Sequence, residues 1–194
     1  MDEKMRLIAK SFGENKVKFD ENLSSHVALK VGGPAKLFAV AISEREIIKL
    51  VEECRFLKIP FLIIGTGSKM VISDQGYEGV IIKNRTQNIK IVSIKGQVSK
   101  NSIGVNSVLV EVEGGVSINQ FIDFLNKQSL DTEGLVGLTG SIGGNLWSNR
   151  SLQDWVESIK VLNSETEIEN LIFRNLNLSE HVILSVTFKV KTKK

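Results

Sequence analysis

The chain has 194 residues, of which 42% are hydrophobic and 24% charged, a composition typical of globular proteins and unlike that of disordered chains. Its 25 basic and 22 acidic residues leave a net charge of +3, which is too small to indicate nucleic acid as a partner. One cysteine, two histidines and no apolar run of roughly 20 residues argue against disulfides, a zinc site and a membrane span, so we expect a cytoplasmic protein.

Two segments have the pattern of a capped amphipathic helix. In the first, at 43–58, Ser43 is followed three residues later by Glu46 and then by apolar residues at helical spacing. The second begins with the pair Ser117 and Gln120, which also precedes one apolar face. The sequence therefore predicts one such helix in each half of the chain.

Seven segments are rich in β-branched or aliphatic residues between turn residues, which predicts strands. They are 36–41, Phe61–Ile64, 80–83, 89–94, 108–112, 159–162 and 182–190. The last alternates apolar and other residues with period two, the pattern of a strand with one buried face. We expect the basic tail 191–194 to be frayed and solvated.

The polar stretch 84–88 is the predicted boundary between two small lobes, 1–84 and 85–194. Strands outnumber helices and do not alternate strictly with them, which favours an α+β fold over a doubly wound parallel sheet. A ligand is expected between the two lobes.

A glycine-containing loop follows the predicted strand Phe61–Ile64. It consists of Gly65, Thr66, Gly67, Ser68, Lys69 and Met70. Such a loop can direct several backbone N–H groups toward a phosphate, but its spacing matches neither a P-loop nor a dinucleotide fingerprint. A turn without any ligand is the alternative.

A second segment holds five glycines within eleven residues: Gly134, Gly137, Gly140, Gly143 and Gly144. Glycine at this density lets another backbone, or a flat ring, approach closely, and tight packing of two elements is the alternative to a ligand. Two separate glycine-rich segments together suit a ligand that has both a diphosphate and a planar ring, such as FAD.

The order and spacing of three motifs resemble the UDP-N-acetylmuramate dehydrogenase family, also called UDP-N-acetylenolpyruvoylglucosamine reductase. The motifs are Asn22 with 31–35 (Val-Gly-Gly-Pro-Ala), 64–82, and 134–149. The resemblance implies a two-lobed FAD-binding domain of the vanillyl-alcohol-oxidase type. It also implies hydride transfer from NADPH to FAD and then to a UDP-linked enolpyruvyl amino sugar, in peptidoglycan precursor synthesis.

The resemblance assigns roles to individual residues. The loop 65–70 would hold the FAD diphosphate, with Lys69 where the family has asparagine. Arg174 would be the catalytic residue that faces the substrate carboxylate, because a guanidinium can stabilise the charge that hydride addition builds there. The segment beside the flavin would comprise Gly140, Ser141, Ile142, Gly143, Gly144 and Asn149.

The chain departs from the family pattern after Asn149, where the expected glycines and aromatic residue are replaced by Arg-Ser-Leu-Gln-Asp. The family also has a third, substrate-binding domain, with a serine proton donor and a glutamate, beyond the strand that matches 182–190. No residue here matches those two roles, and a partner chain is one expected source of them. Two other hypotheses stay open: a FAD-binding module without reductase activity, and a flavin subunit of another oxidoreductase.

Overall fold

The computed structural model describes residues 3–99, 102–173, 177 and 180–193. The chain divides into two compact units, Met1–Thr86 (unit 1) and Gln87–Lys194 (unit 2). This division falls within the polar stretch 84–88. Each unit has its own sheet and its own core.

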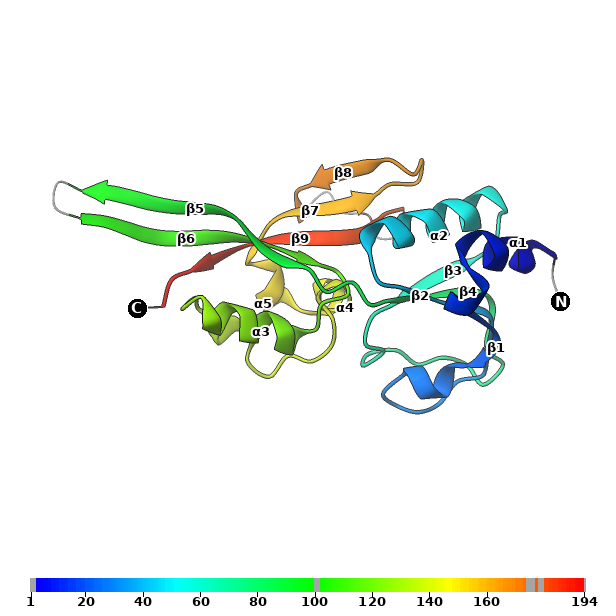
Figure 1. Ribbon diagram of the computed structural model, residues 1–194. Helices are drawn as coiled ribbons and strands as arrows, with labels where there is room; N and C mark the ends of the chain where they lie inside the picture. The colour runs from blue at the N-terminus through cyan, green and yellow to red at the C-terminus, as the bar shows by residue number, and fades with distance from the viewer. Residues whose placement is uncertain (1–2, 100–101, 174–176, 178–179, 194) are drawn as a thin grey trace. The chain divides into compact units, whose positions relative to one another are not determined.

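Unit 1 is built on a four-stranded sheet in the order β1-β2-β4-β3 (Figure 1). Strands β2, β4 and β3 are parallel to one another, and β1 is antiparallel to β2. The carboxyl ends of the three parallel strands therefore meet at one edge of the sheet. The elements of this unit are α1 (Glu3–Phe12), β1 (Val17–Asn22), β2 (Pro34–Ala41), α2 (Glu44–Phe56), β3 (Phe61–Ile64) and β4 (Tyr77–Asn84), with 3-10 turns at Glu14–Lys16 and Leu23–His26.

The two faces of this sheet are covered differently. Helices α1 and α2 lie on one face, and the loops around the Leu23–His26 turn lie on the other (Figure 1). Phe38 of β2 and Ile81 of β4, partners in register, bury their side chains with Leu23 and Ile72 from those loops. The second face is thus a core built from loops, and these loops are the ones that carry the motifs singled out in the sequence.

The predicted helix at 43–58 is confirmed as α2, with Ser43 as its N-cap. The Ser43 hydroxyl oxygen accepts a hydrogen bond from the Glu46 N–H at 3.3 Å. The helix ends at Phe56, before Lys58, whose positive φ of 55° is incompatible with a continued helix. Its buried face includes Cys54, where burial, aided by the Glu53 charge, raises the thiol pKa to about 12.

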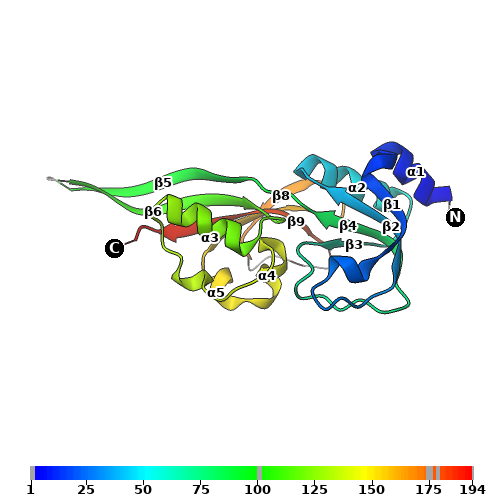
Figure 2. The ribbon, with the colours of Figure 1, turned by 60° about the horizontal axis from the view of Figure 1, so that its bottom comes forward.

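Unit 2 is built on a five-stranded antiparallel sheet in the order β5-β6-β9-β7-β8. The α-helices among its described residues lie on one face of this sheet (Figure 2). There Phe121 of α3 and Phe188 of β9 meet with ring centroids 5.1 Å apart. The elements are β5 (Ile89–Ser99), β6 (Ser102–Glu113), α3 (Ile118–Lys127), α4 (Ile142–Ser148), α5 (Arg150–Gln153), β7 (Val156–Leu162), β8 (Ile168–Leu171) and β9 (Val182–Lys191), with a 3-10 turn at Glu133–Leu135.

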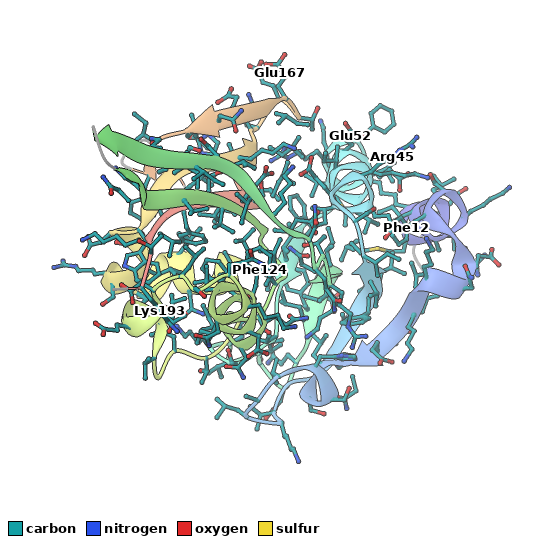
Figure 3. The ribbon with its side chains drawn as sticks, turned by 60° about the vertical axis from the view of Figure 1, so that its left-hand side comes forward. Phe12, Arg45, Glu52, Phe124, Glu167 and Lys193 are labelled. Atoms are coloured by element: carbon teal, nitrogen blue, oxygen red, sulfur yellow. The ribbon has the colours of Figure 1, made fainter. Side chains whose placement is uncertain are left out.

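Strand β9 confirms the period-two prediction, because Leu184, Val186, Phe188 and Val190 are all buried. The prediction of a frayed tail is wrong for 191–193, although Lys191 and Lys193 are exposed as expected; Lys194 lies outside the described residues. The Lys191 carbonyl accepts a hydrogen bond from Asp131 N–H, and Lys193 Nζ donates to the Asn126 side chain at 2.7 Å, which places Lys193 beside α3 (Figure 3). The segment after α3 supplies backbone partners that the tail sequence alone does not indicate.

The α+β fold class is confirmed by these mixed layers. Over the described residues, no helix is both long and apolar enough to cross a membrane. In the same part of the chain, no group of three or more His, Cys, Asp or Glu side chains is arranged to hold a metal ion.

Candidate functional site

The loop 65–70 leaves the carboxyl end of β3 in unit 1, and Gly67 is fixed there by backbone packing. Its φ is +77°, and a Cβ at this position would lie 2.2 Å from the His26 carbonyl oxygen. The Gly67 carbonyl in turn accepts a hydrogen bond from Ala28 N–H at 3.1 Å. Glycine is therefore required at 67 by the packing of two loops, whatever else the loop binds.

The polar groups of this loop lie at its surface. Thr66 and Lys69 are exposed, and Ser68 is half-buried. The Thr66 and Ser68 hydroxyl oxygens lie 3.1 Å apart. Met70, in contrast, packs against the loop-side core of unit 1. Two adjacent hydroxyls and a lysine on a backbone anchored by a left-handed glycine are suited to a phosphate group.

The neighbouring motif Gly32-Gly33-Pro34 packs against residues 73–76, which follow the loop 65–70 in the connection between β3 and β4. Gly33 N–H donates to the Ser73 carbonyl at 2.9 Å, and a Cβ on Gly33 would lie 2.1 Å from the Asp74 carbonyl oxygen. A Cβ on Gly76 would likewise lie 2.0 Å from the Pro34 carbonyl oxygen. These glycines hold the connection between β3 and β4 against the start of β2.

The segment 140–144 lies in unit 2, where it passes close to the turn that follows β6. Ile142 N–H donates to the Val116 carbonyl at 2.8 Å and Gly143 N–H to the Gly114 carbonyl at 2.9 Å. Since a Cβ on Gly143 would lie 3.1 Å from that same Gly114 oxygen, the close packing of two elements explains this glycine. Both amides have partners within the chain.

Three other predicted positions in unit 2 have local structural roles. Ser141 caps α4 by accepting a hydrogen bond from Gly144 N–H at 3.4 Å. Asn149 caps α5 by accepting one from Leu152 N–H at 3.4 Å. Gly140 has a positive φ of 103°, which forms the turn into α4.

The open part of the glycine-rich segment is 136–140. Gly137 has a φ of +80°, and a Cβ there would meet no atom within 4 Å, while Val136 is 73% exposed. Gly134 differs, because a Cβ there would lie 2.8 Å from the ring of Trp155. The surface at 136–140 thus has the room for a flat group that the sequence analysis expected of the whole segment.

The predicted residues fall into two groups, 65–70 in unit 1 and 140–149 in unit 2. Arg174, the predicted catalytic residue, lies outside the described residues. His26 has an ordinary hydrogen-bonding role: its Nε2 lies 2.9 Å from the Glu21 carboxylate, and its ring stacks on Phe38 at 4.1 Å. The hydrogen bond from His26, with Lys18 adding to it, lowers the pKa of Glu21.

Unit 1 also has a pocket of about 400 Å³ that was not predicted from the sequence. At one wall stands Lys83, only 8% exposed, whose ammonium donates to the His26 carbonyl at 3.3 Å. Burial, and to a smaller extent the nearby Arg85, lowers the pKa of Lys83. A lysine that ends the buried apolar run at 80–83 was the available signal. The pocket is lined by Asn15, Lys16, Val17, Lys18, His26, Phe38, Val40, Ile42, Glu46, Lys83 and Arg85.

With one mixed sheet and one antiparallel sheet, each carrying a glycine-rich segment, the fold is an α+β FAD-binding domain of the vanillyl-alcohol-oxidase type. Residues 35–171 match the family model described as "FAD binding domain", and the chain belongs to that family.

Among curated proteins, the chain is similar to UDP-N-acetylenolpyruvoylglucosamine reductases, which confirms the resemblance. It is 32% identical to the one from Syntrophus aciditrophicus over 188 residues, covering 90% of this chain and 58% of that protein. The identity to the one from Clostridium perfringens strain SM101 is 28% over 178 residues, covering 89% and 55%. The chain thus spans a little over half the length of these relatives.

Solved structures share the fold. The UDP-N-acetylenolpyruvylglucosamine reductase of Thermus caldophilus superposes with a TM-score of 0.66 at 17% identity, covering 92% of this chain and 62% of that one. A p-cresol methylhydroxylase with substrate bound gives a TM-score of 0.67 at 13% identity, covering 98% and 43%. At these identities the similarity concerns the fold alone.

Proposed function

We propose that this chain binds FAD, with its diphosphate on the loop 65–70 of unit 1 and its flavin ring against 140–149 of unit 2. The observation that carries the proposal is the structure of this loop. Gly67 has a left-handed backbone conformation and packs against the His26 carbonyl, and the hydroxyls of Thr66 and Ser68 stand on either side of it. The loop leaves the carboxyl end of a parallel strand, which is where α/β sheets bind their ligands.

Each residue of the loop would contribute differently to the diphosphate. The hydroxyls of Thr66 and Ser68 would donate hydrogen bonds to phosphate oxygens, and the Lys69 ammonium would neutralise part of the diphosphate charge. In unit 2, the open surface at 136–140 leads into the segment 140–149 and would leave room for the ring system to approach that segment. FAD, once bound, supplies a hydride acceptor that can pass the hydride on to a second substrate.

We further propose that the bound FAD serves an NADPH-dependent reduction of a UDP-linked enolpyruvyl amino sugar. This rests on the names of the similar curated proteins, which are UDP-N-acetylenolpyruvoylglucosamine reductases. Arg174 would face the carboxylate of the enolpyruvyl group and stabilise the charge that builds there as hydride adds. A FAD-binding module without independent reductase activity is the second candidate, because the family model that matches residues 35–171 describes FAD binding alone.

Flavin binding is tested by adding FAD to the purified chain, removing free FAD by gel filtration and recording the visible spectrum. We expect stoichiometric retained flavin, and we expect Ser68→Asp to weaken FAD binding by about tenfold or more, because a carboxylate then faces the diphosphate. Ser164→Asp is the matched control, since it adds the same charge at an exposed turn of unit 2. Undiminished FAD retention by Ser68→Asp would reject this loop as the diphosphate site.

The reductase hypothesis is tested anaerobically on the flavin-loaded protein. NADPH should bleach the flavin, and the enolpyruvyl substrate should restore its absorbance. Arg174→Lys should slow reoxidation by the substrate roughly tenfold or more while leaving bleaching by NADPH unchanged, since a lysine cannot make the bidentate contact. Equal slowing of both half-reactions would remove Arg174 from the substrate step, and flavin that is retained but inert would favour the binding module.

A further inference from the structure

The pocket in unit 1 shares no lining residue with the proposed FAD-binding segments. None of its walls comes from 65–70 or 140–149. The His26 carbonyl lies between the two features: Lys83 Nζ donates to it from the pocket, while Gly67 packs on it from the loop. The pocket therefore lies at the carboxyl ends of β2 and β4 in the same sheet, next to the His26 backbone on which the loop packs.

The polar lining of the pocket is strongly biased toward positive charge. Its four basic side chains are Lys16, Lys18, Lys83 and Arg85, and Glu46 is its one carboxylate. Glu46 is already engaged, because it accepts hydrogen bonds from Lys16 Nζ at 2.6 Å and from Ile42 N–H at 2.8 Å.

The pKa of the Glu46 carboxyl is lowered despite burial. Burial by itself raises the pKa of this carboxyl, but the Ile42 amide and the Lys16 ammonium together outweigh burial and hold the pKa below its ordinary value. The carboxylate therefore stays charged and paired with Lys16, and Lys18 is paired with Glu21 at 3.0 Å. Lys83 and Arg85 then face a pocket whose lining, among the described residues, includes no further acid. Two cations beside each other in a half-buried site favour an anionic ligand.

The rest of the lining is apolar and includes a pair of stacked rings. His26 lies on Phe38 with centroids 4.1 Å apart and an interplanar angle of 27°. Val17, Val40 and Ile42 complete the apolar wall. A ring stack beside aliphatic side chains suits a planar group, and a volume of about 400 Å³ accommodates a ligand the size of a mononucleotide.

We propose that this pocket binds a phosphomonoester that carries a planar ring, a ligand of the mononucleotide class, independently of FAD. The phosphate would sit between Lys83 and Arg85, and the ring would lie against His26 and the aliphatic wall. The Asn15 amide would be available for a polar edge of the ring. Such a site goes beyond flavin binding and would let the chain respond to a second small molecule.

The test is a calorimetric titration of the FAD-saturated chain with AMP, adenosine and ribose 5-phosphate. AMP should bind with a dissociation constant at least about tenfold lower than that of either fragment, because only AMP engages both the cations and the ring wall. Lys83→Met and Arg85→Gln should each weaken AMP binding by about tenfold. Arg85 is exposed, so its variant keeps the test valid even if Lys83→Met perturbs folding.

Lys36→Met is the matched control. It removes one positive charge from the same sheet at an exposed position outside the pocket, and it should change AMP affinity less than about twofold. Displacement of AMP by FAD would overturn the proposal by making the pocket part of the flavin site. Absence of AMP binding would overturn it too. If the chain binds no FAD, the same titration on the flavin-free protein still decides the pocket, so the two proposals fail separately.

Discussion

The glycines of the two motifs differ in the space that a side chain would find at each position. Gly67 combines a left-handed backbone with a carbonyl oxygen where a Cβ would stand, whereas Gly137 has the left-handed backbone and open space. The Gly67→Ala variant should therefore lose about 3 kcal/mol of unfolding free energy, and Gly137→Ala about 1 kcal/mol, because overpacking adds to the conformational cost only at 67.

Urea unfolding followed by far-UV circular dichroism measures both losses. Similar losses for the two variants would contradict the packing argument. A large loss for Gly67→Ala also has a practical consequence. If a substitution at 67 abolishes flavin binding, the cause is the loss of folding and not the loss of a contact with the diphosphate. Ser68, which is half-buried at the surface of the loop, is the better probe of the diphosphate.

The sequence shows where these residues are but not what they touch. Glycine at 67 stands out in the chain, yet its partner His26 is far away in sequence and becomes visible only once the two loops pack. Lys83 was predicted as the end of a strand, without a role, because nothing local shows that its ammonium faces a pocket. The positions of candidate residues were thus predictable, and their contacts were not.

At the level of elements, the predictions that succeeded were those with a local cause. Ser43 and Ser117 each cap the helix predicted from them, and Ser117 with Gln120 forms a complete capping box. Helix α1 received no prediction, although Met5, Ile8, Ala9 and Phe12 follow helical spacing. It is held partly by tertiary contacts with α2, including a hydrogen bond from Lys49 Nζ to the Ser11 carbonyl at 2.5 Å.

Helix α4 shows why composition misleads in a glycine-rich segment. Two glycines near its start oppose a helix, and the sequence predicted no helix there. The helix forms because Ser141 caps it and because the Asn145 side chain donates to the Thr139 and Ser141 carbonyls at 2.8 and 2.9 Å. Strand pairing is similarly non-local: the edge strand β8 has a half-exposed pattern that gives little signal, and its register is set by β7.

For the whole molecule, the central fact is that each unit encloses its own buried cluster. The cluster around Phe38 and Ile81 lies wholly in unit 1, and the one around Phe121 and Phe188 lies wholly in unit 2. The chain also separates two natural reporters. Its single cysteine, Cys54, belongs to unit 1, and both tryptophans, Trp147 and Trp155, belong to unit 2.

These reporters allow a perturbation of one unit to be followed in both. Ser117→Ala removes the capping box of α3 and should cost unit 2 about 1 kcal/mol. Tryptophan fluorescence should then show a lower urea midpoint. Cys54 is buried and has a thiol pKa of about 12, so it reacts with a thiol reagent only when unit 1 opens. In the Ser117→Ala variant, the labelling of Cys54 should therefore depend on urea as it does in the unmutated protein.

The control for this experiment is the corresponding cap in unit 1. Ser43→Ala should shift Cys54 labelling to lower urea and leave the tryptophan transition in place, because Ser43 caps the helix that carries Cys54. If either variant moves both transitions equally, the two units unfold as one cooperative body and the separate cores do not act as separate units of stability. If each moves only its own reporter, flavin should then be added, since a ligand bound by residues of both units would couple the two transitions.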